Sequence, residues 1–211
     1  MNQNDQCIIL ASQSPRRKYL LEQAGLTFEV LPSAFDEGSV PLEQPEAYVR
    51  KLAEGKARDI AGQRPAAWVI GADTIVLING TILGKPASAG EARRMLIQLS
   101  GQTHQVLTGY AILHLASNTL HTETISTEVV FKTLSKPEIE WYVHTTEPFD
   151  KAGAYAIQGL GTFLVKKING SYTNVVGLPV CEVIEYLITR GVIGRGIPSA
   201  TETQARGDLN P

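Results

Sequence analysis

Apolar positions follow two alternating patterns along this chain. Short apolar runs at residues 7–10 and 66–72 predict buried strands, and residues 28–31 predict a further strand. Between such runs, apolar residues recur three and four positions apart, most clearly over residues 46–60, and this spacing predicts amphipathic helices. Strands that alternate with helices indicate an α/β fold.

Capping residues predict where several helices begin and end. Ser14 is a suitable N-cap, Pro15 then takes the first helical position, and Gly25 ends the helix. A serine followed three residues later by glutamate predicts two more helix starts, at Ser88 and Ser135. The first third and the middle of the chain thus have defined helix boundaries.

The second half of the chain has longer elements. Residues 104–115 and 119–131 predict two long strands, and residues 162–168 predict a shorter one. A final helix is expected from residue 177 to about 190. The remaining residues, 191–211, are rich in glycine, proline and polar side chains and predict a flexible tail after a single domain over residues 1–190.

Asp73 stands at the end of the apolar run 66–72. Ligand-binding groups of open α/β sheets gather beyond the carboxyl ends of strands, so Asp73 is expected just past its strand, in a site. Residues 74–78 and 81–83 flank Asn79 and Gly80 and predict a hairpin. The alternative is that Asp73 only caps a helix or a turn.

Composition narrows the classes of function. Hydrophobic residues make up 43% of the 211 residues, and the net charge of −2 leaves no basic surface for nucleic acid. Cys7 and Cys181 are far apart and lack metal-ligand spacing, so neither a disulfide framework nor a zinc site is expected. The N-terminus shows no signal peptide and no apolar run long enough for a membrane span. We therefore expect a cytoplasmic protein without nucleic-acid or membrane partners.

The predicted helix after Ser14 has an unusual charge in its first turn. Arg16, Arg17 and Lys18 lie where the helix dipole is positive, at a cost of about 0.3–1 kcal/mol each at exposed sites. This arrangement is reasonable where the helix N-terminus, the arginines and the Ser12 hydroxyl bind a phosphate together. The alternative is a turn whose arginines point into solvent.

Lys56 lies on the apolar stripe of the helix predicted over residues 46–60. A lysine on an inward face must snorkel to solvent, pair with an acid or line a cleft. With it, the chain offers a set of cations and carboxylates for chemistry on a polyphosphate. The cations are Arg16, Arg17, Lys56, Lys85 and Lys151, and the carboxylates are Glu37, Asp73, Asp36 and Asp150.

Signatures of several common enzyme classes are absent from the sequence. It contains no G-x-x-x-x-G-K-[ST] loop, no G-x-G-x-x-G and no G-x-S-x-G. The four histidines show no ligand spacing and are expected to be structural or surface residues. The reaction class that still fits these residues is hydrolysis of a phosphate ester or anhydride with a divalent metal. The few carboxylates present are enough for this reaction, because Mg²⁺ needs few protein ligands and takes the others from water and phosphate.

Eight blocks of the sequence, in order, resemble the Maf family of nucleoside triphosphate pyrophosphatases. They are residues 11–17 (ASQSPRR), 56–57 (KA), 71–74 (GADT), 84–86 (GKP), 100–104 (SGQTH), 150–155 (DKAGAY), 157–159 (IQG) and 174–179 (NVVGLP). The resemblance covers about residues 7–190. It implies hydrolysis of a nucleoside triphosphate to the monophosphate and pyrophosphate with Mg²⁺ or Mn²⁺. It also implies an elongated, twisted mixed sheet flanked by helices, with two lobes around a central cleft, similar to inosine triphosphatases and assembled as a homodimer.

The resemblance also implies roles for single residues. Asp73 matches the catalytic carboxylate that accepts a proton and contributes to the metal site, and Glu37 matches a second acidic residue near the metal. The residues that match the phosphate-binding set are Ser12, Arg17, Lys56 and Lys85. One departure is Gly55, where some members of the family carry glutamate or glutamine.

Three positions distinguish branches of that family. Arg16, Thr74 and Gln158 match the branch that acts on dTTP and UTP. The branch that resembles 7-methyl-GTP pyrophosphatases has an aromatic residue, glutamine and glutamate at these positions. The amide of Gln158 offers a donor and an acceptor, which suits a pyrimidine edge, whereas an ionised glutamate only accepts and suits a cationic purine.

Two other functions stay open at this point. One is the same reaction on 7-methyl-GTP or another modified nucleotide. The other, from a different class, is a nucleotide-binding regulator of septum formation, which needs the phosphate-binding cations but neither Asp73 nor Glu37. The presence of both carboxylates favours the enzyme.

Overall fold

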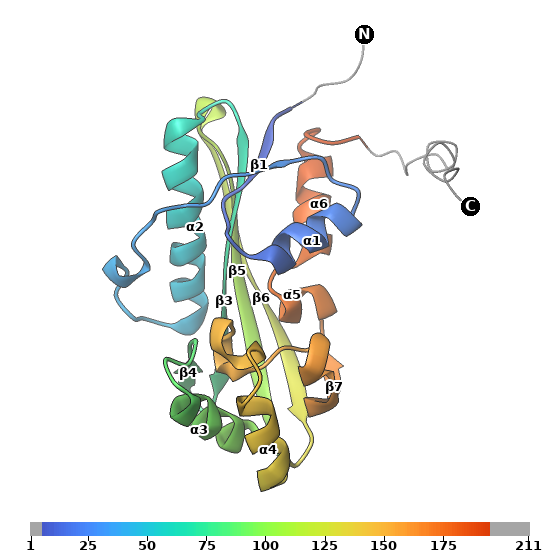
Figure 1. Ribbon diagram of the computed structural model, residues 1–211. Helices are drawn as coiled ribbons and strands as arrows, with labels where there is room; N and C mark the ends of the chain where they lie inside the picture. Colours follow the sequence, from blue (N-terminus) through green and yellow to red (C-terminus); the bar gives the residue numbers. More distant parts are fainter. Residues whose placement is uncertain (1–5, 195–211) are drawn as a thin grey trace, which may run out of the picture.

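A twisted mixed β-sheet runs the length of the molecule in the computed structural model, which describes residues 6–194 (Figure 1). Its strands are β1 (Ile8–Leu10), β2 (Glu29–Val30), β3 (Trp68–Ile78), β4 (Thr81–Leu83), β5 (Thr103–His114), β6 (Thr119–Phe131) and β7 (Val165–Asn169). The order is β2-β1-β3-β5-β6-β7, and β4 pairs with β3. β1 is parallel to β2 and β3, whereas the other pairings are antiparallel. This mixed sheet with helices confirms the predicted α/β class.

Helices cover both faces of this sheet. They are α1 (Pro15–Gln23), α2 (Pro45–Gln63), α3 (Ala89–Leu99), α4 (Lys136–Val143), α5 (Tyr172–Val176) and α6 (Val180–Thr189). In Figure 1, α2 lies along one face, α1, α5 and α6 lie on the other, and α3 and α4 lie at the lower end. The N-cap at Ser14 and the capping box of Ser135 and Glu138 are both present, as predicted.

The two faces of the sheet follow from the alternation of side chains along each strand. Ile9 and Val69 pack against α2, whereas Leu10 and Ile70 pack in the core with α1 and α6. Gly71 lets α2 approach closely, because a Cβ there would lie 2.2 Å from the carbonyl oxygen of Ala53 and 3.0 Å from the backbone nitrogen of Ala57. This contact fixes the distance between α2 and β3.

A separate core fills the lower end of the molecule. It joins the last residues of β3 to β4, α3 and α4, with Val76, Ile78, Leu96, Phe131 and Tyr142 among its members. The polar residues Asp73 and Thr74 therefore stand in β3 between the upper cores and the lower one. The two sets of cores agree with two lobes, and the cleft between them stays a prediction.

Two of the predicted elements differ from the structure, and one observed helix was not predicted. The runs 66–72 and 74–78 form one strand, so Asp73 lies in the middle of β3 and not beyond a strand end. The ladder to β5 continues through this point, with Asp73 opposite Gly109, and keeps the strand extended. β7 begins at Val165, because residues 159–164 form a 3₁₀ helix. The short helix α5 was absent from the prediction.

The end of the described chain packs into the fold. Val192 is 3% exposed and belongs to the core that α6 shares with the sheet. The predicted flexible tail spans residues 191–211, and its residues 195–211 lie outside the part of the chain that the structure describes. Between residues 6 and 194, no helix is long and apolar enough to cross a membrane.

Because His104 is buried, we expect the protein to lose stability in acid. Its side chain is 2% exposed, its Nε2 pairs with the Tyr155 hydroxyl at 2.7 Å, and burial lowers its pKa to about 4. An unfolded histidine has a pKa near 6.5, so the unfolded state binds more protons between these values. The contribution of neutral His104 to the free energy of unfolding is thus fully present above about pH 6.5. It is lost as the pH drops to 4, which lowers the free energy of unfolding by up to about 3 kcal/mol.

Urea unfolding at pH 7, 5.5 and 4.5 measures this loss. The His104→Gln variant lacks the titrating group, and we expect its free energy of unfolding to fall less steeply over this range. The exposed His144→Gln change is the control and is expected to keep the wild-type slope. Equal slopes for His104→Gln and the wild type would show that another group causes the acid sensitivity.

Candidate active site

An ammonium group between two carboxylates forms the centre of the candidate site. Lys56 Nζ of α2 lies 2.6 Å from Asp73 Oδ1 of β3 and 2.8 Å from Glu37 Oε1. The side chains of Lys56 and Asp73 are only 13% and 14% exposed, whereas that of Glu37 is 56% exposed. Of the three alternatives for Lys56, the structure shows pairing with acids.

Local backbone structure explains why these groups meet. Asp73 points toward α2 because it lies two residues after Gly71, on the same face of β3. Lys56 precedes Ala57, whose backbone packs on Gly71. Glu37 begins a 3₁₀ helix (Glu37–Ser39) that Asp36 caps by accepting a hydrogen bond from Gly38 N at 3.0 Å.

The charges around Glu37 determine its pKa. Burial raises the pKa of this carboxyl, but the hydrogen bond and charge of Lys56, with the charges of Lys85 and Arg17, outweigh burial and lower it overall. Glu37 is therefore ionised at neutral pH. Lys85 is exposed and contributes charge to this group of residues from the loop after β4.

Arg17 joins three segments beside Thr74, the residue that follows Asp73 in β3. Its Nε donates to the carbonyl of Gly177 at 2.7 Å, its Nη1 to Ser12 Oγ at 3.3 Å and its Nη2 to Thr74 Oγ1 at 3.1 Å. Burial lowers the pKa of Arg17, and the charge of Asp73 opposes part of this effect. Thr74 also pairs with the Thr108 hydroxyl at 2.9 Å. The predicted residues Ser12, Arg17 and Thr74 are thus in direct contact.

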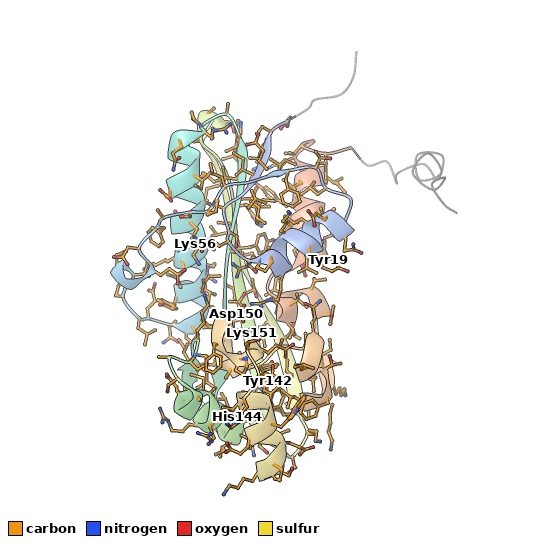
Figure 2. All side chains as sticks on the ribbon, in the orientation of Figure 1. Tyr19, Lys56, Tyr142, His144, Asp150 and Lys151 are labelled. Atoms are coloured by element: carbon orange, nitrogen blue, oxygen red, sulfur yellow. The ribbon has the colours of Figure 1, made fainter. Side chains whose placement is uncertain are left out.

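Arg16 extends the site toward residues 150–158. Its Nη1 lies 3.2 Å from Asp150 Oδ2, and Lys151 donates to the Glu147 carbonyl at 2.7 Å and to Asp150 Oδ1. Figure 2 shows Lys56 on α2, with Asp150 and Lys151 on the segment between the two ends of the molecule. Gln158 is partly buried at the start of the 3₁₀ helix Gly159–Leu164.

Comparison with known proteins identifies the family of this chain. A family model described as Maf-like protein matches residues 7–190. The chain belongs to the Maf family. Relatives named dTTP/UTP pyrophosphatase include those of Citrifermentans bemidjiense, 52% identical over 89% of this chain and 97% of that protein, and of Halalkalibacterium halodurans, 52% identical over 87% and 96%. The relative from Syntrophus aciditrophicus is 49% identical over 87% of this chain and 90% of that protein.

Among solved structures, a Ham1 protein from Staphylococcus aureus has a TM-score of 0.48 with this Maf chain. The two are 13% identical, and the match covers 87% of this chain and 98% of that chain. Nothing about the site follows from a similarity of this size.

Tyr48 of α2 lies close enough to the site of this Maf chain for the charges of Asp73 and Glu37 to act on its phenol, and the sequence analysis did not predict it. Burial raises the pKa of its phenol, and the negative charges of Asp73 and Glu37 raise it further. Tyr48 lies eight residues before Lys56 in α2, beyond the three- and four-residue spacing that brings helical side chains into contact, so the sequence does not predict its place near the site. The sequence likewise does not predict that the Gly177 carbonyl accepts a hydrogen bond from Arg17.

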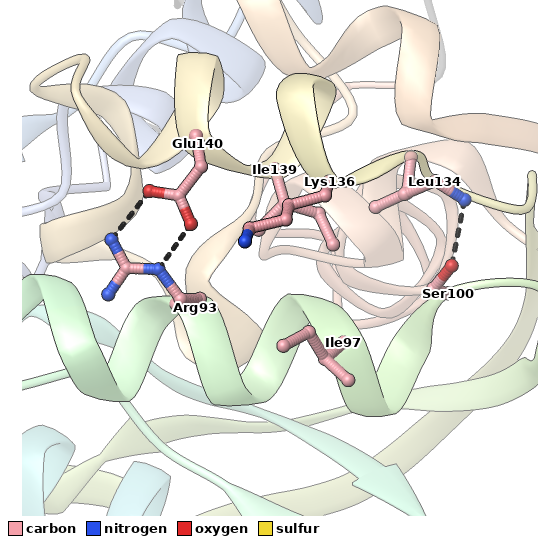
Figure 3. Close-up of a pocket in the computed structure, with 7 residues that line it drawn as sticks. All are labelled: Arg93, Ile97, Ser100, Leu134, Lys136, Ile139 and Glu140. Carbon is pink, nitrogen blue, oxygen red and sulfur yellow. Dashed lines mark hydrogen bonds and ion pairs between the residues drawn. The ribbon is translucent and has the colours of Figure 1, made fainter.

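A pocket of about 370 Å³ lies elsewhere in this Maf chain, between α3 and α4 (Figure 3). Its lining residues are Arg93, Ile97, Ser100, Leu134, Lys136, Ile139 and Glu140. Arg93 and Glu140 form a bidentate ion pair there, with contacts of 2.6 and 2.7 Å. None of the predicted site residues lines this pocket, so it is separate from the candidate active site.

Proposed function

We propose that this chain hydrolyses dTTP and UTP to the nucleoside monophosphate and pyrophosphate. The observation that carries the proposal is the contact of Lys56 with Asp73 and Glu37, which gathers a cation and two carboxylates beside Arg17. Relatives about half identical over nearly their whole length are named dTTP/UTP pyrophosphatase, which supports the same reaction here.

The site fits a divalent metal ion such as Mg²⁺ or Mn²⁺. Two carboxylate oxygens already converge on one positive charge, the ammonium of Lys56. Within residues 6–194, no group of three or more histidine, cysteine, aspartate or glutamate side chains is gathered for a metal. A hard ion that takes its other ligands from water and phosphate needs no more than Asp73 and Glu37. When bound, the ion supplies positive charge that offsets the charge developing on the phosphoryl group.

The cations of the chain bind the triphosphate in this proposal. Arg17 offers a guanidinium beside the N-terminus of α1, where backbone N–H groups and the Ser12 hydroxyl also attract an anion. Lys56 and Lys85 add positive charge from α2 and from the loop after β4. Together these four residues hold the β- and γ-phosphates and direct the α-phosphorus toward Asp73.

Asp73 accepts the proton in the chemical step. A water molecule attacks the α-phosphorus, and a new P–O bond forms as the bond from phosphorus to the α,β-bridging oxygen breaks. The proton of the water moves to Asp73, and the bridging oxygen leaves with the pyrophosphate. A carboxylate that is 14% exposed is shielded from bulk water and suits this role.

Three further residues select the pyrimidine base. Thr74 is held by Arg17 and Thr108, so its position is coupled to the phosphate-binding residues. Arg16 is held by Asp150, at the start of the segment that ends with Gln158. The Gln158 amide then offers its donor and acceptor to the O4 and N3–H edge of thymine or uracil.

The remaining properties in this proposal come from the family resemblance and from the composition of the chain. The enzyme acts as a homodimer in the cytoplasm, and residues 1–190 form its catalytic domain. Light scattering on the purified protein measures the mass in solution. A mass of a single chain at micromolar concentration would contradict the dimer.

A panel of nucleotides tests the function. The purified protein is incubated with dTTP, UTP, CTP, GTP and 7-methyl-GTP, each with Mg²⁺ or Mn²⁺, and the products are separated. We expect monophosphate and pyrophosphate from dTTP and UTP. A preference for 7-methyl-GTP would contradict the roles of Arg16, Thr74 and Gln158, and binding without turnover would favour the regulator.

The Gln158→Glu change tests base selection directly. An ionised glutamate cannot donate to O4 of the base, so we expect kcat/KM for dTTP and UTP to fall about tenfold or more, with a smaller change for the other nucleotides. Gln98→Glu, the same change on the exposed side of α3, is the control. An equal loss for every nucleotide would mean that Gln158 does not read the base.

A further inference from the structure

The segment that carries Glu37 is attached to α2 at successive points. Asp59 Oδ2 accepts hydrogen bonds from the Ser33 hydroxyl and from Ala34 N, both at 2.8 Å. One helical turn earlier in α2, Gly55 lies under the ring of Phe35. The segment between β2 and α2 therefore follows the surface of α2 until Glu37 reaches Lys56.

The contact of Phe35 with Gly55 requires glycine. A Cβ at residue 55 would lie 2.4 Å from Cζ of Phe35, and 2.5 and 2.7 Å from its two Cε atoms, which is closer than real Cβ atoms approach. Glycine in a helix interior is less favourable than alanine. Here the missing side chain lets the aromatic ring sit against the helix, one residue before Lys56.

Glu37 depends on this attachment because its own surroundings hold it weakly. Its side chain is 56% exposed, and the three-residue 3₁₀ helix that it begins has no buried residue. Phe35 is partly buried and lies only two residues before it. The ring on Gly55 is thus the nearest apolar anchor on the N-terminal side of this carboxylate, and Asp59 holds the preceding residues.

We propose that Phe35, seated on Gly55, is the positioning residue for Glu37. This inference rests on the proposed function, in which Glu37 takes part in the reaction. The ring holds the 33–39 segment on α2 so that the Glu37 carboxylate stays beside Lys56 and Asp73. The absence of a side chain at residue 55 is what admits the ring.

A double-mutant cycle on kcat/KM for dTTP tests the inference. Phe35→Ala alone is expected to lower kcat/KM about ten- to a hundredfold, since small displacements in a site can cost this much. In the Glu37→Gln background the same change is expected to cost less than about twofold, because the group that it positions is already lost. Equal losses in both backgrounds would overturn the inference.

Gly55→Ala provides an independent test without truncating the ring. The added Cβ displaces Phe35 while alanine favours the helix, so we expect kcat/KM to fall about tenfold while the unfolding temperature stays within a few degrees of the wild type. The matched control is Gly62→Ala in the same helix, where a Cβ meets nothing within 4 Å. Gly62→Ala is expected to keep wild-type kcat/KM, and the same result for Gly55→Ala would contradict the role of Phe35.

The outcomes separate this inference from the proposed function. Wild-type turnover of dTTP with a loss in Glu37→Gln supports the function, and the cycle then decides the role of Phe35. No turnover of dTTP or UTP by the wild type would overturn the function and the inference with it. Wild-type kcat/KM in Glu37→Gln would remove Glu37 from the reaction and leave Phe35 without a group to position.

Discussion

Replacing Asp73 with asparagine is expected to lower kcat for dTTP about a thousandfold. The amide has the same shape, and its oxygen can still accept the hydrogen bond that Lys56 donates at 2.6 Å. It cannot accept a proton from water, and it is a poorer ligand for a divalent metal. Steady-state kinetics measures the loss, and thermal unfolding checks that the fold is intact.

The control for this prediction removes a carboxylate outside the site. Glu128→Gln changes an exposed side chain of β6 that contacts Asn169, and we expect wild-type kcat. Near-normal kcat for Asp73→Asn would exclude Asp73 as the proton acceptor. A loss in both variants would point to a general effect of charge on the protein.

Replacing Lys56 with methionine is expected to lower kcat/KM for dTTP by a factor of about one hundred to one thousand, or about 3–4 kcal/mol of transition-state stabilisation. Methionine keeps a long apolar stem but loses the ammonium that holds Asp73 and Glu37 together. The carboxylates then repel each other, and the triphosphate loses a cation. We also expect the free energy of unfolding to fall by about 1–3 kcal/mol, because Asp73 loses its partner.

Lys51→Met is the matched control for Lys56→Met. Lys51 lies on the same helix, pairs with Glu43 at 2.7 Å and is 55% exposed. Exposed ion pairs contribute about 0–1 kcal/mol, so both kcat/KM and stability are expected to stay near wild type. If Lys56→Met behaved like Lys51→Met, the group of Lys56, Asp73 and Glu37 would not be the active site.

Much of the fold could be predicted from local signals in the sequence. Ser14 and Ser135 begin helices because their side chains satisfy backbone N–H groups of the first turn, an effect that needs no distant contact. The strand over residues 119–131 follows from its composition and is observed with the same limits. The short helix α5 escaped prediction because five residues carry too little periodicity.

The position of Asp73 could not be predicted from local signals. A polar pair after six apolar residues and a glycine resembles a strand end, but pairing with β5 carries β3 through Asp73 and Thr74 to Ile78. At Asp73 and Thr74 that pairing joins residues 36 and 34 positions apart, and the sequence shows no local sign of it. The prediction of a functional carboxylate at this position still stands, although the geometric reason for it was wrong.

The composition of the candidate site was foreseen in part. Lys56 was conspicuous as a cation on an apolar stripe, and the structure supplies its partners, Asp73 and Glu37. The role of Gly55 could not be predicted from the sequence, because only the folded chain brings Phe35 over it. Contacts between distant segments, such as Arg17 with the Gly177 carbonyl, likewise depend on the tertiary fold.

Hydrolysis of dTTP in ¹⁸O-labelled water, followed by mass spectrometry of both products, tests the central claim most directly. Attack of water on the α-phosphorus places one labelled oxygen in dTMP and none in pyrophosphate, and this is the result we predict. Label in pyrophosphate would show attack on the β-phosphorus. Formation of dTDP and phosphate would show attack on the γ-phosphorus, and either result would contradict the account.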